Sequence, residues 1–249
     1  MNQYDEMADR YVKIRTRDEY GYFAVRDFTL VSQLDSLEGK SVLDLACGNG
    51  YCTRMLKKKG AETCVGVDIS EQMISLARKL ESENPLGIEY VCSPVEALDH
   101  LGDFDIVVGS MLLHYAENRD TLFSICNSIY KNSLKGGRFW GLTENSGHGA
   151  HFPQENYAKY GLRFEALESF EEAAPMRATV FSSLGDVSMD YHYYEREVYT
   201  MTLKKAGFEV LEWHGLKIPP ALIEEKGSGH WDFLIEHPHM VMVECMKSS

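Results

Sequence analysis

The sequence predicts an α/β protein whose centre is a seven-stranded, mostly parallel sheet with helices on both faces. Short apolar runs rich in Val and Ile alternate with helical stretches, a pattern typical of parallel strands joined by crossover helices. A turn of small residues, 46–50, directly follows the first of these runs. The chain has 249 residues, of which 44% are hydrophobic, and is long enough to bury one full core. We therefore expect a single domain over residues 1–249.

The expected elements follow one another in regular order. Strands are expected at residues 41–46, 64–69, 88–92, 104–111 and 137–143. The helices between them are expected at residues 52–59, 70–81 and 119–134. Ser70 opens the second of these helices, where its hydroxyl oxygen can accept a hydrogen bond from a free amide of the first turn. A helix at 195–206 and two strands at 208–216 and 239–246, separated by a loop, complete the sheet.

Residues 144–194 interrupt this alternation. The segment is rich in His, Tyr and Phe and contains no clear strand–helix repeat. An unstructured stretch of this length is uncommon in a compact domain, so we expect it to fold as a cap. Ligands of open α/β sheets bind outside the carboxyl ends of the strands, and a segment that follows the fifth strand begins on that side. The expected fold is therefore a Rossmann-like sheet with an aromatic-rich cap after strand five.

The turn after the first strand predicts where a ligand binds. Its sequence, Asp44-Leu-Ala-Cys-Gly-Asn-Gly50, leaves backbone amides uncovered at the start of a helix, which suits a ligand that approaches the main chain closely. A dinucleotide site would have the pattern G-x-G-x-x-G, but the corresponding residues are Ala46, Gly48 and Tyr51. The missing third glycine argues against a nicotinamide-dependent oxidoreductase, which remains an alternative.

Four motifs in order resemble those of the class I methyltransferases that use S-adenosylmethionine (SAM). The turn at 44–50 resembles motif I, and Gly66-Val-Asp68-Ile69-Ser70 resembles motif II. The run Asp103-Phe-Asp-Ile-Val-Val-Gly109 is similar to the fourth strand of that family, and Leu134-Lys-Gly-Gly-Arg-Phe139 to the turn before its fifth strand. Two positions depart from the pattern. Ala46 stands where the family has its first glycine, and Ser93 stands where an Asp often contacts the adenine.

The resemblance implies SAM as cofactor and S-adenosylhomocysteine as product. It implies that Asp68 accepts hydrogen bonds from the ribose hydroxyls. The N-terminal run YDEMADRYVKIR resembles the helix that covers the cofactor, so residues 1–35 are expected to form cofactor-covering helices, with Tyr4 and Tyr11 facing the sulfonium. The cofactor-binding residues implied in this way are Tyr4, Tyr11, Arg15, Asp44, Ala46, Cys47, Gly48, Gly50, Asp68, Ile69, Met73, Ser93, Pro94, Val95, Ser110 and Met111.

The predicted activity is methyl transfer to N or O of a small aromatic or heterocyclic metabolite. The C-terminal third is similar to small-molecule methyltransferases of secondary metabolism, in particular those of the toxoflavin-pathway N-methyltransferase kind. Tyrosines suit a planar acceptor, so the insert is expected to form the acceptor pocket. The catalytic candidates are His114, Tyr194 and Tyr11, with His148, His151 and His192 as weaker single candidates. A base is needed only if the acceptor still carries its proton. A non-catalytic SAM-binding protein is the other alternative.

Composition restricts partners and location. The net charge of −13 disfavours nucleic acid, because affinity for nucleic acid depends on Lys and Arg neutralising phosphates. No run of about 18 apolar residues predicts a membrane span. The six cysteines contain no C-x-x-C pair, so we expect no metal site and reduced thiols in a cytoplasm. The expected partner is a small-molecule acceptor, and the expected state is a monomer or a homodimer.

Overall fold

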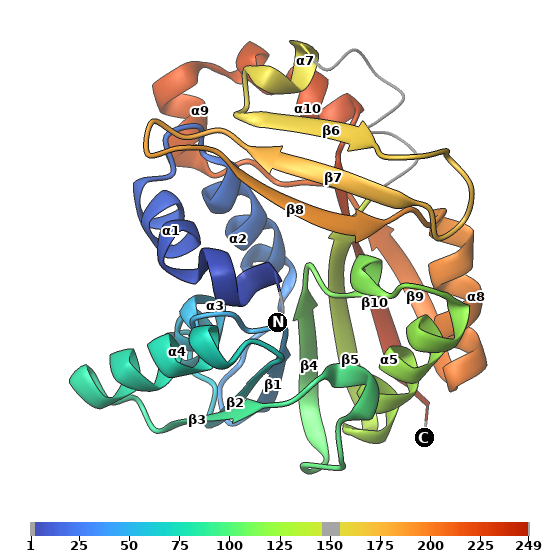
Figure 1. Cartoon of the computed structure of the whole chain (residues 1–249). Coiled ribbons are helices and arrows are strands. Elements are labelled where there is room, and N and C mark those ends of the chain that lie inside the picture. The colour runs from blue at the N-terminus through green and yellow to red at the C-terminus, as the bar shows by residue number, and fades with distance from the viewer. Residues whose placement is uncertain (1–2, 146–154, 249) are drawn as a thin grey trace.

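A computed structural model describes residues 3–145 and 155–248. Its centre is a seven-stranded sheet with the strand order β3-β2-β1-β4-β5-β10-β9 (Figure 1). β1 to β5 are parallel, whereas β10 is antiparallel to both of its neighbours. The strands are β1 (Ser41–Leu45), β2 (Thr63–Asp68), β3 (Ile88–Cys92), β4 (Phe104–Ser110), β5 (Ser133–Glu144), β9 (Phe208–His214) and β10 (Met240–Lys247). The predicted seven-stranded, mostly parallel sheet is confirmed.

Helices cover both faces of this sheet because its central strands are apolar on both faces. In β1, Val42 and Leu43 are both fully buried but belong to different hydrophobic clusters, since consecutive side chains point to opposite faces. α2, α3 and α4 pack on one face, and α5 and α8 pack on the other. The helices of the described residues are α1 (Gln3–Arg17), α2 (Tyr22–Gln33), α3 (Tyr51–Lys58), α4 (Glu71–Glu83), α5 (Arg119–Lys131), α7 (Glu155–Ala158), α8 (Arg196–Ala206), α9 (Pro220–Lys226) and α10 (Asp232–Glu236), with short 3-10 turns η1 (Val95–Ala97), η2 (Leu113–Tyr115) and η3 (Ser228–His230).

Some predicted boundaries differ from the structure for identifiable reasons. α5 ends at Lys131 instead of residue 134, because the Asn132 side chain accepts a hydrogen bond from the amide of Leu101 and donates one to the carbonyl of Ser128. β5 therefore begins at Ser133, four residues earlier than expected. The predicted loop before β10 contains α9, η3 and α10. Pro220 occupies the first turn of α9, where the amide that it lacks would have no helical partner.

The described part of the insert at 144–194 forms α7 and a second, smaller sheet. Its strands β6 (Leu162–Ala166), β7 (Pro175–Val180) and β8 (Val187–His192) are antiparallel in the order β6-β7-β8. Figure 1 shows this sheet above the carboxyl ends of β4 and β5, next to α1 and α2. β8 is an edge strand, and the amide group of Gln3 in α1 makes two hydrogen bonds of 3.0 Å to the backbone of Asp190. The insert and the N-terminal helices thus meet above one edge of the main sheet.

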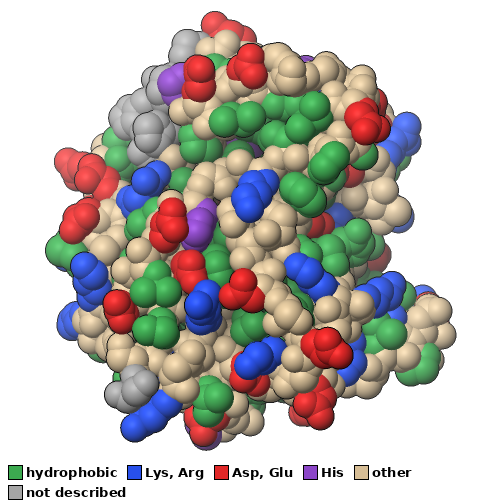
Figure 2. Space-filling view, turned by 180° about the vertical axis from the view of Figure 1, so that it is seen from behind, with side chains coloured by type: hydrophobic (Ala, Val, Ile, Leu, Met, Phe, Trp, Pro, Cys, Tyr) green, Lys and Arg blue, Asp and Glu red, His purple; other side chains and the backbone are tan. Residues whose placement is uncertain are grey.

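The surface mixes charges of both signs. On the face shown in Figure 2, acidic and basic side chains are interspersed with hydrophobic ones. Within residues 3–145 and 155–248, no helix has the length and apolar character needed to cross a membrane.

Candidate functional site

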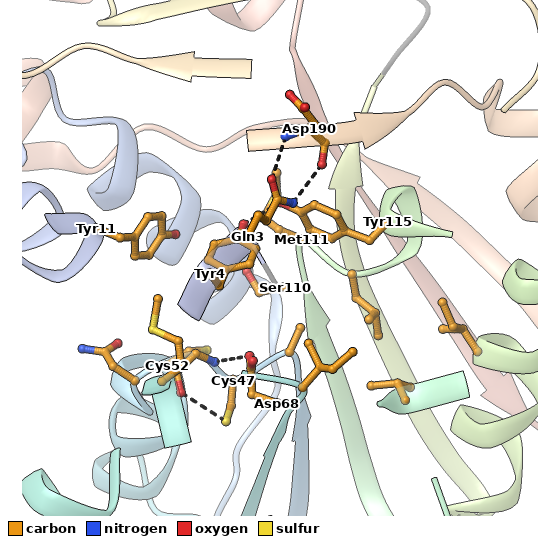
Figure 3. Close-up of a pocket in the computed structure, with 18 of the residues that line it drawn as sticks. Gln3, Tyr4, Tyr11, Cys47, Cys52, Asp68, Ser110, Met111, Tyr115 and Asp190 are labelled. Carbon is orange, nitrogen blue, oxygen red and sulfur yellow. Dashed lines mark hydrogen bonds between the residues drawn. The ribbon is translucent and has the colours of Figure 1, made fainter. Parts of the chain in front are cut away.

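A cavity of about 540 Å³ opens at the carboxyl edge of the main sheet. It lies above β1 and β4, the neighbouring strands at which the strand order of the sheet reverses. Open α/β sheets bind their ligands at this point. Figure 3 shows Cys47 and Asp68 at one end of the cavity and Asp190 of β8 at the other, with tyrosines between them. The two ends are therefore built by the main sheet and by the insert.

The turn after β1 exposes its backbone to this cavity. Ala46, Gly48 and Gly50 all have positive φ angles, of 58°, 56° and 77°, which coil the chain into the start of α3. A Cβ atom built on Gly48 would meet no atom within 4 Å, so a side chain there would project into open space. A Cβ on Gly50 would instead collide with the Tyr90 phenol. Gly48 thus keeps the main chain bare toward the cavity, whereas Gly50 permits packing behind the turn.

Asp68 ends β2 beside that turn. Its carboxylate accepts hydrogen bonds from the amide of Gly48 at 2.8 Å and from the amide of Ser70 at 2.9 Å. Burial raises the pKa of this carboxyl group, and the two amides oppose the rise. Ser70 in turn caps α4 and donates to Asp5 of α1 at 2.6 Å. Asp68 is therefore an oriented acceptor at the cavity wall, because each carboxylate oxygen has a second lone pair.

Two arginines from the N-terminal helices supply positive charge. Arg15 of α1 pairs with Asp27 at 2.6 Å, and its guanidinium lies 4.1 Å from the centre of the Tyr51 ring. Arg26 of α2 contacts the same Asp27 at 3.4 Å. One carboxylate thus faces two guanidinium groups. Both arginines line the cavity, whereas the Nε of Arg15 is shielded from solvent and has no hydrogen-bond partner in the described chain.

Three tyrosines line the middle of the cavity. The Tyr4 and Tyr115 hydroxyls are 2.5 Å apart, and the Tyr4 ring meets the rings of Tyr11 and Tyr115 edge to face. Tyr11 accepts a hydrogen bond from Arg26 at 2.9 Å. Burial raises the pKa of both Tyr4 and Tyr115 above the ordinary value, so these hydroxyls stay protonated at neutral pH.

Twelve of the residues that the sequence suggested as cofactor-binding line this cavity. They are Tyr4, Tyr11, Arg15, Ala46, Cys47, Gly48, Asp68, Ile69, Met73, Val95, Ser110 and Met111. The remaining four, Asp44, Gly50, Ser93 and Pro94, do not line it. Asp44 is fully buried behind the turn, accepts a hydrogen bond from the Thr53 hydroxyl at 2.6 Å, and has its pKa raised to about 7 by burial. Its side chain connects β1 to α3.

Of the three main catalytic candidates, only Tyr11 lies at the cavity. His114 is buried outside it, with Nδ1 3.0 Å from the Thr143 hydroxyl, and burial lowers its pKa to about 3. Tyr194 is also outside, because its hydroxyl donates to the Ala116 carbonyl at 3.0 Å within the core. These positions contradict a direct catalytic contact by His114 or Tyr194. His148 and His151 lie outside the described residues.

Sequence reasoning located only part of the wall that the insert contributes. The tyrosines of the insert were expected to form the acceptor pocket, but Tyr193 and Tyr194 are both buried and neither lines the cavity. Asp190, which the sequence did not suggest, and His192, one of the weaker catalytic candidates, line it instead. In β8 the burial alternates, so that Met189 and Tyr191 enter the core while Asp190 and His192 face outward. The pairing of β8 with β7 fixes this alternation, and the local sequence gave no sign of that partner. Gln3, Arg26, Tyr115 and Glu117 were missed as well.

Comparisons with known proteins point to one kind of chemistry. Residues 42–133 match a family model described as a methyltransferase domain. The chain is 27% identical over 209 residues to the N-demethylindolmycin N-methyltransferase of Streptomyces griseus, and this match covers 81% of this chain and 83% of that relative. It is 33% identical over 116 residues to a ubiquinone biosynthesis O-methyltransferase of Coxiella burnetii. That second match covers 46% of this chain and 48% of that relative, or about half of each.

The fold is shared with a solved enzyme of similar size. The 1,6-didemethyltoxoflavin-N1-methyltransferase of Burkholderia thailandensis was solved with 1,6-didemethyltoxoflavin and S-adenosylhomocysteine bound. It aligns with a TM-score of 0.59 and 17% identity, over 98% of this chain and 88% of that chain. At this level of identity the likeness establishes the common fold.

Proposed function

We propose that this chain, which is a class I SAM-dependent methyltransferase, transfers a methyl group to a nitrogen atom of a small aromatic or heterocyclic molecule. The observation that carries the proposal is a cavity with a bare glycine turn at one end and a wall of the insert at the other. Its volume of about 540 Å³ is in the range of sites for small ligands. The match to the Streptomyces N-methyltransferase over most of both chains favours nitrogen over oxygen.

The sequence left two alternative functions open, an oxidoreductase and a non-catalytic SAM-binding protein. The oxidoreductase interpretation of the glycine turn is wrong, because the matched family model and relatives are methyltransferases. A protein that binds SAM without catalysis is disfavoured because the cavity extends past the glycine turn to β8. That extension provides space for a second ligand.

The residues at the bare turn fit SAM. The open space in front of Gly48 admits a ligand against the main chain, and Asp68 offers oriented oxygens for the ribose hydroxyls. The positive charges of Arg15 and Arg26, both of which line the cavity, fit the carboxylate of the methionine part. Val95 and Ile69 offer apolar surface for the adenine.

SAM supplies a methyl group on a positively charged sulfur. This chain contributes orientation and a dry site. We assign the faces of Tyr4, Tyr11 and Tyr115 to the stabilisation of the positive charge, since aromatic rings attract cations by about 0.5–2 kcal/mol. α1 places two of these rings and also covers the turn, so the same helix encloses the cofactor and keeps water away from the sulfur.

Replacing Asp68 tests the cofactor half. We expect Asp68→Asn to weaken binding of S-adenosylhomocysteine by roughly 1.5–3 kcal/mol, or about tenfold to a hundredfold, because a charge-assisted acceptor is lost. Calorimetry measures this affinity, and thermal unfolding checks the fold. Asp103→Asn is the matched control, since Asp103 is exposed and does not line the cavity. Equal affinities of Asp68→Asn and wild type would remove Asp68 from the cofactor site.

A transfer assay tests the function itself. The full chain is incubated with methyl-labelled SAM and a pool of small aromatic amines, nitrogen heterocycles and phenols, and labelled products are identified by mass spectrometry. We expect label on nitrogen compounds. Label found only on phenol oxygen would contradict the choice of nitrogen, and bound SAM with no labelled product in any pool would contradict methyl transfer to this class of molecule.

A further inference from the structure

His192 stands out among the groups at the end of the cavity farthest from the glycine turn. It is the last residue of β8, it lines the cavity, and it is half-buried. Two residues earlier on the same strand, the backbone of Asp190 is hydrogen-bonded to the side chain of Gln3. The carboxylate of Asp190 accepts two hydrogen bonds from Arg177. The strand that carries His192 is therefore fixed on both sides, so the ring has a defined place in the cavity wall.

A nitrogen acceptor that carries a hydrogen must lose a proton when it is methylated, so the cavity needs a group that takes it. Most titratable groups at the cavity are unsuited. The Tyr4 and Tyr115 hydroxyls are protonated, and Asp68 lies at the cofactor end, where backbone amides bind it. Asp190 is paired with Arg177 through two hydrogen bonds of 2.6 and 2.7 Å. Glu96 and Glu117 are exposed at the rim.

His192 has the protonation state that this task requires. Burial lowers its pKa below the usual value, so its ring is neutral at neutral pH and has one free lone pair. The charged and titratable groups around it are Glu117 and Asp190, which oppose the shift, and His114, whose own pKa is lowered. Glu117 would stabilise the imidazolium formed when the ring accepts a proton.

The two ring nitrogens of His192 are not equivalent. Nδ1 is shielded from solvent and has no hydrogen-bond partner in the described chain. Nε2 is not among the side-chain atoms that are both shielded from solvent and without a hydrogen-bond partner. Because the residue lines the cavity, Nε2 is the nitrogen available to a ligand.

We propose that Nε2 of His192 accepts the proton that the nitrogen acceptor loses on methylation, an assignment that rests on the proposed function. The acceptor nitrogen forms a bond to the methyl carbon as the carbon–sulfur bond breaks, and the electron pair of that bond stays on sulfur. The proton of the nitrogen passes to Nε2, and the imidazolium then releases it to water at the rim beside Glu117. No oxidant or further reactant is needed.

The first test needs no acceptor. Proton NMR of the imidazole rings, in the full chain with S-adenosylhomocysteine, gives the pKa of His192, and His192→Asn assigns its signal. We expect a value below the ordinary value of about 6.5, and a lower one in Glu117→Gln, which removes the nearby anion. A value above about 7.5 would overturn the proposal, since the ring would already be a cation at neutral pH.

The second test uses an acceptor found in the transfer assay. We expect His192→Asn to lower kcat at least tenfold near neutral pH, to abolish the acid limb of the pH–rate profile, and to change the affinity for S-adenosylhomocysteine less than threefold. Imidazole added to the buffer should restore part of kcat. His100→Asn is the matched control, because His100 is exposed at the other end of the sheet, before β4.

The results separate the two proposals. If the wild type methylates a compound and His192→Asn does so with the same kcat and the same acid limb, the role of His192 is overturned and the methyltransferase function stands. If the wild type methylates no compound in the pools, the proposed function fails, whatever the pKa of His192.

Discussion

At the scale of single residues, two side chains at the cavity are held in a backbone conformation that L-residues avoid. Ala46 has a φ of 58° and Met111 a φ of 62°, and both line the cavity. Met111 follows β4, and its amide donates to the Leu142 carbonyl at 2.7 Å, which fixes the turn. Strained residues of this kind cost about 1–3 kcal/mol and persist where the surrounding structure fixes them. Here they position the ends of β1 and β4, between which the ligand is expected to bind.

Ala46→Gly tests this strain. The left-handed conformation costs an alanine about 1–2 kcal/mol, whereas the extra freedom of glycine in the unfolded chain costs about 0.4–1 kcal/mol. We therefore expect a rise of roughly 0.5 kcal/mol in the free energy of unfolding, measured by urea denaturation. Ala24→Gly, in the right-handed helix α2, should instead lose about 1 kcal/mol. A loss of similar size in both variants would show that Ala46 is not strained.

At the scale of elements, prediction succeeded where the signal is local and failed where it depends on a partner. Ser70 was identified as a helix cap from its hydroxyl and position, and its oxygen does accept from the Met73 amide at 3.2 Å. The central parallel strands β1 and β4 were found because they are buried and apolar on both faces. In β8, by contrast, the choice between Tyr191 and His192 for the cavity depends on the pairing with β7. Aromatic residues occur on either side of that choice, so composition could not decide it.

α1 connects the cofactor end of the cavity to the insert. Asp5 accepts a hydrogen bond from Ser70, the residue that caps α4, and two residues earlier Gln3 pairs with the backbone of β8. Tyr4, between them, contacts Tyr115 of η2. One turn of helix thus contacts three separate elements around the cavity. The resemblance of the N-terminal run predicted its position beside the cofactor. It did not predict the contact of Gln3 with β8.

Gln3→Ala tests this connection. The two hydrogen bonds to Asp190 are solvent-exposed, so together we expect them to contribute about 1 kcal/mol and their loss to raise local opening of α1 roughly fivefold. Native-state hydrogen exchange of the α1 amides measures this opening. Lys13→Ala, an exposed change on the same helix, is the control. Unchanged exchange in Gln3→Ala would mean that α1 is held by its packing alone.

At the scale of the whole molecule, buried titratable groups between the main sheet and the insert determine how stability depends on pH. Burial lowers the pKa of His114 and of His239 to about 3, and neither nitrogen of His239 has a hydrogen-bond partner among residues 3–145 and 155–248. Burial raises the pKa of Glu144 to about 8. The sequence identified His114 but not these neighbours, because their burial results from the packing of β5 and β10 beneath the insert.

These groups act in opposite directions. A histidine whose folded pKa is lowered contributes its full stability above the unfolded pKa of about 6.5 and loses it as pH falls toward 3, because the unfolded chain binds the proton first. Glu144 behaves inversely, since the unfolded chain loses its proton near pH 4.5 and the folded chain keeps it until about 8. The contribution of these groups to stability should therefore be greatest near pH 6.5, falling at lower pH through the two histidines and falling between about pH 6.5 and 8 through Glu144.

His239→Phe isolates one of these terms. The His239 ring packs 5.5 Å from Phe164 and 5.8 Å from Tyr22, centre to centre, so a phenyl ring suits the site and removes two unpartnered nitrogens. We expect the variant to match or exceed the wild-type free energy of unfolding at about pH 8. Between about pH 6.5 and 5 its decline should be shallower by up to about 1.4 kcal/mol per pH unit, since one proton fewer is taken up on unfolding. Urea denaturation at a series of pH values measures both, with His100→Gln as the exposed control. Parallel pH curves for the variant and the wild type would mean that His239 already binds its proton in the folded chain.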